Sequence, residues 1–188
     1  MHGVWRTVVE GVTGSMAYIA DRRWNVVACN AEFEGLFPDG RAPSNIMRWM
    51  LLDDRAREGT LLNWAEDWAR GACPALRQAV TDHPADPELV ELASDVRFDP
   101  VAGPIYLATA ASRAVHPDGA VRRVDHAAHG PGWVIVTAAN PLPDIDARFV
   151  MMRFRPGTVR PQQPPPLRAG HASSRRDALA TTPVTSRS

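Results

Sequence analysis

Short apolar runs near both ends of the chain follow the pattern of β-strands. Residues 18–30, YIADRRWNVVACN, hold two apolar stretches on either side of a polar corner at residues 21–23. Residues 132–138 are rich in β-branched side chains, and residues 148–154 partly alternate between polar and apolar positions. The pattern predicts a hairpin near the N-terminus and an antiparallel pair of strands near the end of the fold.

The middle of the chain has the spacing of amphipathic helices. Asn30 and Asn45 each precede an apolar stripe, and the side-chain oxygen of either can accept a hydrogen bond from a free amide of the first turn. Asp86 precedes Pro87, and proline is favoured at the first position of a helix. Residues 106–115 fit either a helix or a strand, and we favour a helix.

A longer helix is expected after Asp53, which can act as its N-cap. Gly71 and Pro74 interrupt the apolar pattern of this helix, so we expect a kink or a break near Ala72. The buried face would consist of Leu61, Trp64, Ala65, Trp68, Ala72 and Leu76.

Strands at both ends with helices between them predict an α+β fold, in which an antiparallel sheet is assembled from both ends of the domain. We assign this domain to residues 1–156. Residues 157–188 are rich in Pro, Arg and Ser and hold few large apolar residues. Such a segment cannot bury enough surface to offset the entropy lost on ordering, so a disordered tail is expected.

The charges divide the chain into an acidic body and a basic tail. All 21 basic residues are arginines, and they are matched by 21 acids. Residues 157–188 contain five arginines and one acid, which leaves residues 1–156 with 16 arginines, 20 acids and a net charge of −4. Because DNA binding depends on neutralising phosphates, no direct DNA binding is expected of this body.

Neither a membrane span nor a secretion signal is evident in the sequence. No apolar run approaches the roughly 18 residues of a membrane span, and Glu10 interrupts any signal-peptide core. Cys29 and Cys73 are too few for a disulfide framework. We therefore expect reduced thiols and a cytoplasmic location.

The sequence offers no convincing catalytic motif. Residues 11–15, GVTGS, lack the Lys-Ser/Thr ending that a phosphate-binding loop needs. His126 and His129 have the i, i+3 spacing of metal ligands on one helical face, but no clear third ligand is apparent. We expect no enzyme activity, no metal and no cofactor.

Aromatic and sulfur-containing side chains gather in the helical middle, at Met47, Trp49, Met50, Trp64 and Trp68. They could form an adaptable pocket for a flexible apolar ligand, and they could equally be ordinary core. An arginine among them, Arg48, could pair with a carboxylate or phosphate of a ligand, or with a helix acid such as Asp53.

Several motifs together resemble one known family. They are Ala17 to Asn30, Phe37-Pro38, Asn45 to Met50, Asp53 with Ala56-Arg57, Trp64, Leu76-Arg77 and Asp86 to Leu89. In this order they resemble the MmyB-like ligand-binding domain, over residues 4–156 and most specifically over residues 17–92. The resemblance implies a PAS-like fold and a role in actinobacterial transcription regulators, where the domain normally follows an Xre-type helix-turn-helix domain.

The chain also departs from that family pattern. No helix-turn-helix domain fits before the resemblance begins, so a stand-alone domain is expected. The family usually has a tryptophan where this chain has Cys29, and losing an indole there would enlarge or reshape a cavity. The aromatic helix before the last strands is represented only loosely, by Tyr106, Ala110 and Arg113.

We therefore predict a stand-alone sensory domain that binds a small, largely apolar molecule, an acyl chain being one candidate. It would act through a partner protein, for which a helix-turn-helix regulator is a candidate, and a homodimer is left open. The alternative is a ligand-free protein–protein interaction module. The ligand-binding residues implied are Cys29, Phe33, Phe37, Met47, Arg48, Met50, Trp64, Trp68 and Tyr106.

Overall fold

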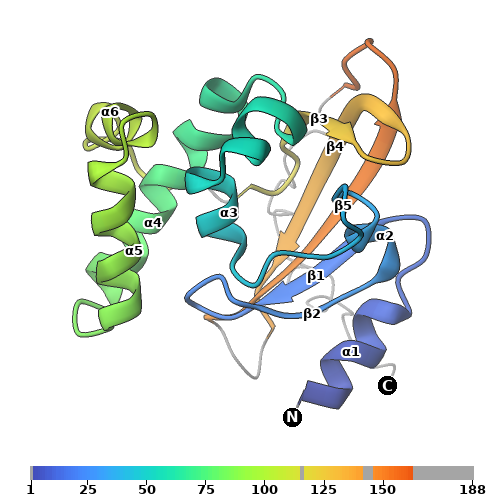
Figure 1. Cartoon of the computed structure of the whole chain (residues 1–188). Helices are drawn as coiled ribbons and strands as arrows, with labels where there is room; N and C mark the ends of the chain where they lie inside the picture. The colour runs from blue at the N-terminus through green and yellow to red at the C-terminus, as the bar shows by residue number, and fades with distance from the viewer. Residues whose placement is uncertain (1, 115–116, 142–145, 163–188) are drawn as a thin grey trace, which may run out of the picture.

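A computed structural model describes residues 2–114, 117–141 and 146–162, and it contains a five-stranded antiparallel sheet (Figure 1). The last strand lies between the N-terminal hairpin and the other two strands, so Tyr18 is the register partner of Val150. The predicted α+β fold, with a sheet assembled from both ends of the domain, is confirmed. The strand order is β2 (Val26–Cys29), β1 (Met16–Ala20), β5 (Arg148–Pro156), β4 (Gly130–Ala139) and β3 (Val121–His126).

Strand β3 was not anticipated from the sequence. Residues 121–126 read VRRVDH, and their two valines are three positions apart rather than two, so the alternation typical of a strand is weak. Pairing with β4 over the whole of β3 supplies the order that the local pattern lacks, with Arg122 opposite Val134.

Asn30 joins the hairpin to the short helix α2 (Ala31–Glu34). Its Oδ1 atom accepts hydrogen bonds from the backbone amides of Phe33 and Ala17, at 3.0 and 2.9 Å. Its Nδ2 atom donates to the carbonyls of Val12 and Ser15. The predicted helix cap is confirmed, and the same buried amide also ties the start of β1 to the end of β2.

The predicted caps at Asn45 and Asp53 are also confirmed. Asn45 caps α3 (Ile46–Leu52) by accepting from the amide of Arg48, and Asp53 accepts from the amide of Ala56. The helical chain that follows is divided into the π-helical turns η1 (Ala56–Thr60) and η2 (Ala65–Ala69) and the helix α4 (Arg70–Asp82).

Of the kink or break expected near Ala72, a break is wrong, because α4 runs through this residue. The chain is interrupted earlier, at residues 61–63, where Asn63 adopts a left-handed φ of 54°. Pro74 lies inside α4, but it is only the fifth residue of that helix. It therefore removes one hydrogen bond next to a π-helical turn that is already irregular, and α4 continues to Asp82.

Two further helices complete the fold. Helix α5 (Pro87–Phe98) begins at Pro87 as predicted, but the Asp86 side chain makes no capping hydrogen bond. Helix α6 (Ala102–Ala108) confirms a helix only for the first three residues of the predicted segment 106–115, and turn residues follow. Most of the predicted tail, residues 163–188, lies outside the described residues.

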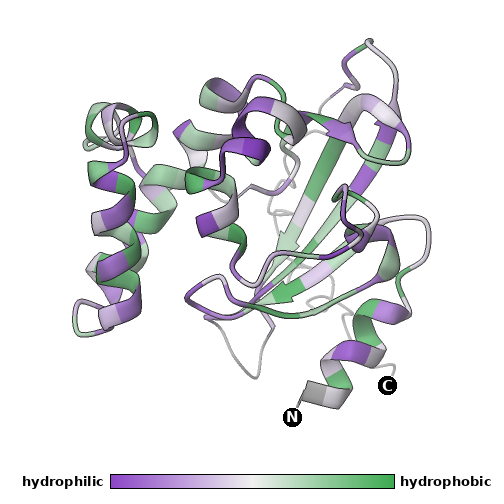
Figure 2. Ribbon diagram, in the orientation of Figure 1, coloured by the Kyte–Doolittle hydropathy of each residue, from purple (hydrophilic) through white to green (hydrophobic). Residues whose placement is uncertain are grey.

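The sheet separates two apolar layers. Tyr18 on one face of β1 belongs to the main core with α3 and α4, whereas Ala17 and Ile19 on the other face pack against Val9 of α1 (His2–Glu10). Polar and apolar bands alternate around α5 (Figure 2), and its buried side includes Leu92. None of the described helices combines the length and apolar character needed to cross a membrane.

Candidate ligand-binding cavity

A cavity of about 500 Å³ lies between the sheet and helices α3 and α4. Its apolar wall is formed by Trp24, Ile46, Met47, Met50, Trp68, Ala72, Ala75, Ala79, Val136, Ala138, Val150 and Met152. Polar side chains also border it: Tyr18, the three arginines Arg22, Arg122 and Arg148, and acids that include Asp82 and Asp146. The cavity therefore combines a largely apolar body with a cationic part.

Strand alternation places one tyrosine and two arginines on the cavity side of the sheet. Tyr18 on β1 has the same orientation as its core neighbours Met16 and Ala20. Arg148 on β5 is in phase with the core residue Val150, and Arg122 on β3 is in phase with the core residue Val124. Residues from three different strands thus converge on one enclosed space.

Arg122 forms no ion pair with a carboxylate of the described residues, although Asp67 acts on it electrostatically. Among the described residues it makes neither an ion pair nor a side-chain hydrogen bond; its guanidinium lies 5.0 Å from the centroid of the Trp68 ring. Gly71 lies close by, because a Cβ atom there would be 3.4 Å from Nη2 of Arg122. Burial lowers the pKa of Arg122, although an arginine remains charged at neutral pH.

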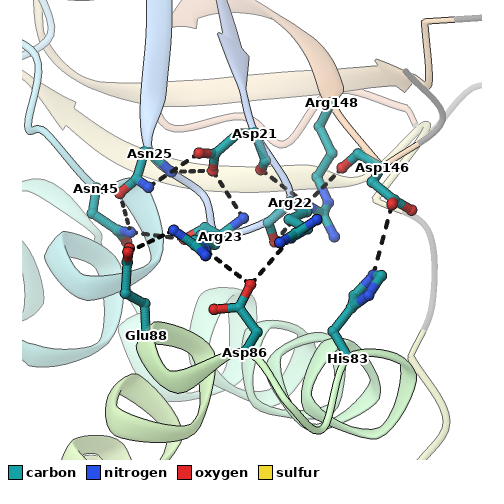
Figure 3. Close-up of polar contacts among 10 residues, drawn as sticks. All are labelled: Asp21, Arg22, Arg23, Asn25, Asn45, His83, Asp86, Glu88, Asp146 and Arg148. Carbon is teal, nitrogen blue, oxygen red and sulfur yellow. Dashed lines mark hydrogen bonds and ion pairs between the residues drawn. The ribbon is translucent and has the colours of Figure 1, made fainter. Parts of the chain in front are cut away.

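The hydrogen bonds of Arg148 go to backbone carbonyls. Its Nη1 atom donates to the backbone carbonyls of Asp21, Arg22 and Asp146 at 3.3 to 3.4 Å (Figure 3). Its guanidinium lies 4.2 Å from the centroid of the Trp24 ring. Burial lowers the pKa of this arginine as well. The side chain is fixed in place by carbonyls, and its charge is only partly offset by the nearby carboxylates of Asp146 and Asp21.

Tyr18 lies within electrostatic range of both guanidinium groups. Its side chain is buried, and its ring packs against Phe33 with centroids 4.6 Å apart. Burial raises the pKa of Tyr18 to about 12, against the opposing effect of Arg122 and Arg148. The hydroxyl therefore stays protonated at neutral pH, and it makes no hydrogen bond to a described residue. One donor and two cations thus face the same space.

An ion-pair network lies where the β1–β2 turn meets the start of α5 (Figure 3), and one of its members, Arg22, also lines the cavity. Oδ2 of Asp86 accepts hydrogen bonds from Nε of Arg23 at 2.8 Å and from Nε of Arg22 at 3.1 Å. The hydrogen bond from Arg23 is the main cause of the lowered pKa of Asp86. Arg23 also pairs with Glu88. The carboxylate expected to cap a helix instead fastens the hairpin turn to the helical layer.

The same turn is ordered from within by Asp21. Its carboxylate accepts from the amides of Arg23 and Asn25 at 2.8 and 2.9 Å. Trp24 adopts a left-handed φ of 64°, and its ring lines the cavity. The polar corner recognised in the sequence therefore positions both an apolar wall residue and Arg22.

Three of the nine residues predicted to bind a ligand line the cavity, and these are Met47, Met50 and Trp68. Arg48 does not line it: its Nη2 atom pairs with Asp95 at 2.7 Å on the exposed side of α3.

The other five lie outside the cavity wall. Phe33 and Phe37 pack edge to face in the core, and Phe33 also contacts the Tyr18 ring. Trp64 donates to the carbonyl of Met50, and Tyr106 lies under the guanidinium of Arg77. Cys29 is half-buried and is the register partner of Tyr18.

Sequence reasoning missed most of the cavity lining, including the residues that matter most to its chemistry, namely Tyr18, Trp24, Arg122 and Arg148. Tyr18 and Trp24 belong to the hairpin that the sequence predicted, so strand alternation was a usable signal for Tyr18. The orientation of Arg122 depends on the register of β3, which no local pattern indicated.

The histidine pair forms an aromatic cluster. The rings of His126 and His129 lie 4.6 Å apart, and both pack against Phe154. Burial lowers the pKa of His126. No group of three or more potential metal ligands is present in the part of the chain that the structure describes.

Comparison with protein families gives one match. The family model described as MmyB-like transcription regulator ligand binding domain matches residues 3–163, which include every described strand and nearly all of the helical residues. No curated protein matches the chain. The matched family is defined by ligand binding in transcription regulators and is not an enzyme family.

Proposed function

The chain belongs to the MmyB-like transcription regulator ligand-binding domain family, and on this premise we propose that it senses a small amphipathic acid. The acid would occupy the cavity between the sheet and helices α3 and α4, and an acyl chain with a carboxylate is the simplest ligand of this kind. The observation that carries the proposal is the position of Tyr18, Arg122 and Arg148 in a cavity whose wall is mostly apolar, with the acids Asp82 and Asp146 also on its border.

Arg122 would bind the charged end of the ligand. A buried guanidinium that makes no ion pair is costly, and Asp67 acts on Arg122 only from a distance, so a carboxylate that accepts hydrogen bonds from it would offset that cost. Arg148 would add Coulombic attraction, and the protonated Tyr18 hydroxyl would donate a further hydrogen bond. The sequence motifs pointed to Arg48 for this role, but Arg48 is already paired with Asp95.

The apolar walls of the cavity would hold the other end of the ligand. A volume of about 500 Å³ lies within the range typical of sites for small molecules, roughly 300–1,000 Å³. Met47, Met50 and Met152 can adapt to a flexible chain, and Trp24 and Trp68 supply rigid walls. Each methylene transferred from water contributes about 0.8 kcal/mol.

The proposal extends to the setting of the domain. A PAS-like architecture, a cytoplasmic location and signalling through a partner protein fit the antiparallel sheet and the regulator family. A ligand-free interaction module is the second candidate function. The open cavity and the unpaired Arg122 favour ligand binding over a module whose pocket has collapsed.

The direct test is a thermal-shift titration with saturated fatty acids of increasing length, used below their micelle concentrations. The matched controls are the alcohols and the alkyl ammonium ions of the same lengths. At a hundredfold excess over Kd, binding adds about 2.7 kcal/mol, which raises the Tm of a chain of this size by roughly 5–10 °C. We expect the acids to raise Tm most and the ammonium ions least. Equal shifts for acids and ammonium ions would refute the anionic ligand, and no shift with any amphiphile would refute the sensory role.

A further inference from the structure

The face of the sheet opposite the cavity carries four arginines around Trp133. Arg123 on β3 and Arg155 on β5 are the register partners of Trp133 on its two sides. Arg153 is the partner of Ile135 in the next row. The guanidinium groups of Arg123 and Arg160 lie 5.9 and 5.6 Å from the centroid of the Trp133 ring. We call these five residues, Arg123, Trp133, Arg153, Arg155 and Arg160, the Trp133 surface.

The arginines of the Trp133 surface have no acidic partner among the described residues. Arg153, Arg155 and Arg160 are exposed, and the ion pairs of the described residues lie elsewhere. Nε of Arg123 and Nε1 of Trp133 are buried without a hydrogen-bond partner. Buried donors are normally satisfied, so these two point to an acceptor that the described chain does not supply.

This part of the sheet is also left uncovered by the described helices. Helix α1 lies beside β1 and β2, away from β3 (Figure 1). Its apolar side reaches Phe149 and Met151 at the start of β5 but not Trp133. Trp133 with arginines on several sides, on a face that the described helices leave uncovered, has the composition of a protein-interface hot spot.

We propose that the Trp133 surface docks an acidic segment of a partner protein. Charge complementarity identifies the occupant, because arginine forks bind carboxylates with two parallel hydrogen bonds. The chain's own remaining residues are unsuited to this role: residues 163–188 contain four arginines and one acid, so they share the sign of the surface. The inference goes beyond the proposed ligand site and rests on the proposed function only for the existence of a partner.

Nucleic acid is the less favoured occupant. Residues 1–162 hold 17 arginines and 20 acids, so the field of the whole body repels a polyphosphate at long range. Single-stranded nucleic acids also need an aromatic ring face on which a base can stack. Arg123 and Arg160 already lie over the Trp133 ring, which leaves it suited to side-chain contacts.

The docking surface and the cavity lie back to back on the same strands. Arg122 faces the cavity while Arg123 belongs to the Trp133 surface, and Met152 and Arg153 are divided in the same way. A ligand that moves Arg122 would therefore act on a strand that also carries part of the docking surface.

The test is fluorescence anisotropy of a labelled peptide of alternating glutamate and alanine, at low and at physiological ionic strength. The same peptide with glutamine in place of glutamate is the neutral probe. We expect the acidic peptide to bind, the neutral one not to bind, and R153E/R155E to weaken binding by about tenfold or more. The matched control is R41E/R55E, which reverses two exposed arginines elsewhere and should change Kd by less than about twofold.

Three outcomes would overturn the proposal: no binding of the acidic peptide, equal losses in the two double variants, or tighter binding of a single-stranded DNA of the same charge. Fatty-acid thermal shifts on R153E/R155E separate this proposal from the proposed function. An unchanged shift means that the fold and the cavity are intact, so a loss of peptide binding then belongs to the Trp133 surface alone.

Discussion

The guanidinium of Arg122 opposes the burial-driven rise in the pKa of Tyr18, although their strands, β3 and β1, are separated in the sheet by β4 and β5. The curvature of a twisted sheet brings such inward side chains toward one another. Neither side chain has a hydrogen-bonding partner among the described residues. The two residues are therefore the most sensitive positions at which to test the anionic site.

Replacing Arg122 by methionine should weaken binding of a fatty acid by roughly 10- to 100-fold, because a hydrogen bond to a charged group contributes about 1.5–3 kcal/mol. The ligand-free protein should keep its stability or gain some, since an unpaired buried charge is removed. Isothermal titration calorimetry and thermal melts measure the two effects. Arg48→Met is the matched control, and an equal loss of affinity there would contradict the assignment of Arg122.

Replacing Tyr18 by phenylalanine should change the alkaline limb of the stability profile. The pKa of Tyr18 is raised by burial from 10.0 to about 12. Its contribution to stability is thus fully present below pH 10, and it is lost as pH rises toward 12, because the unfolded chain ionises first. Denaturant melts between pH 9 and 12 should show a steeper loss for the wild-type protein than for Tyr18→Phe. Parallel profiles would mean that the hydroxyl is not shielded from water.

Local rules predicted the elements that depend on neighbouring residues. Asn30 and Asn45 cap helices as expected, because a cap needs only its own side chain and the amides two or three residues ahead. Asp86 has the same local signature, yet its carboxylate binds Arg22 and Arg23, which lie more than sixty residues away in the sequence. A charged partner at short range outcompeted the cap, and no local pattern could reveal this.

The candidate site was only partly predictable, because it too depends on contacts between residues that are distant in the sequence. Met47, Met50 and Trp68 lie on helices whose buried faces follow from their spacing, so they were found. Choosing between Arg48 and Arg122 as the cationic residue required the register of β3 and the partner of α3. Both depend on residues that are distant in the sequence. Arg122 is oriented by the pairing of β3 with β4, and Arg48 is paired with Asp95 of α5.

Replacing Asp86 by asparagine should loosen the hairpin turn from the start of α5. The variant keeps the size of the side chain but leaves Arg22 and Arg23 without their shared carboxylate. We expect Tm to fall by about 2–6 °C at neutral pH. The pKa of Asp86 is lowered in the folded state, so its stabilisation is present above its unfolded pKa of about 3.9 and lost as pH falls below it.

The difference in Tm between the wild-type protein and Asp86→Asn should therefore shrink as pH is lowered from neutral to below about 4. Asp54→Asn is a matched control, because that carboxylate is exposed and pairs weakly with Arg57 at 3.4 Å. A constant difference across the pH range would show that the ion pairs of Asp86 do not stabilise the fold.

Replacing Gly132 by alanine should destabilise the sheet between the cavity and the Trp133 surface. A Cβ atom at this position would lie 2.5 Å from the backbone oxygen of Arg155 and 2.6 Å from the Phe154 ring. A backbone atom cannot move aside without disturbing the pairing of β4 and β5, so we expect a loss of about 1–3 kcal/mol in the free energy of unfolding. Urea denaturation measures it. Gly59→Ala is the control, because a Cβ atom there meets nothing within 4 Å, and a comparable loss in that variant would remove the steric explanation.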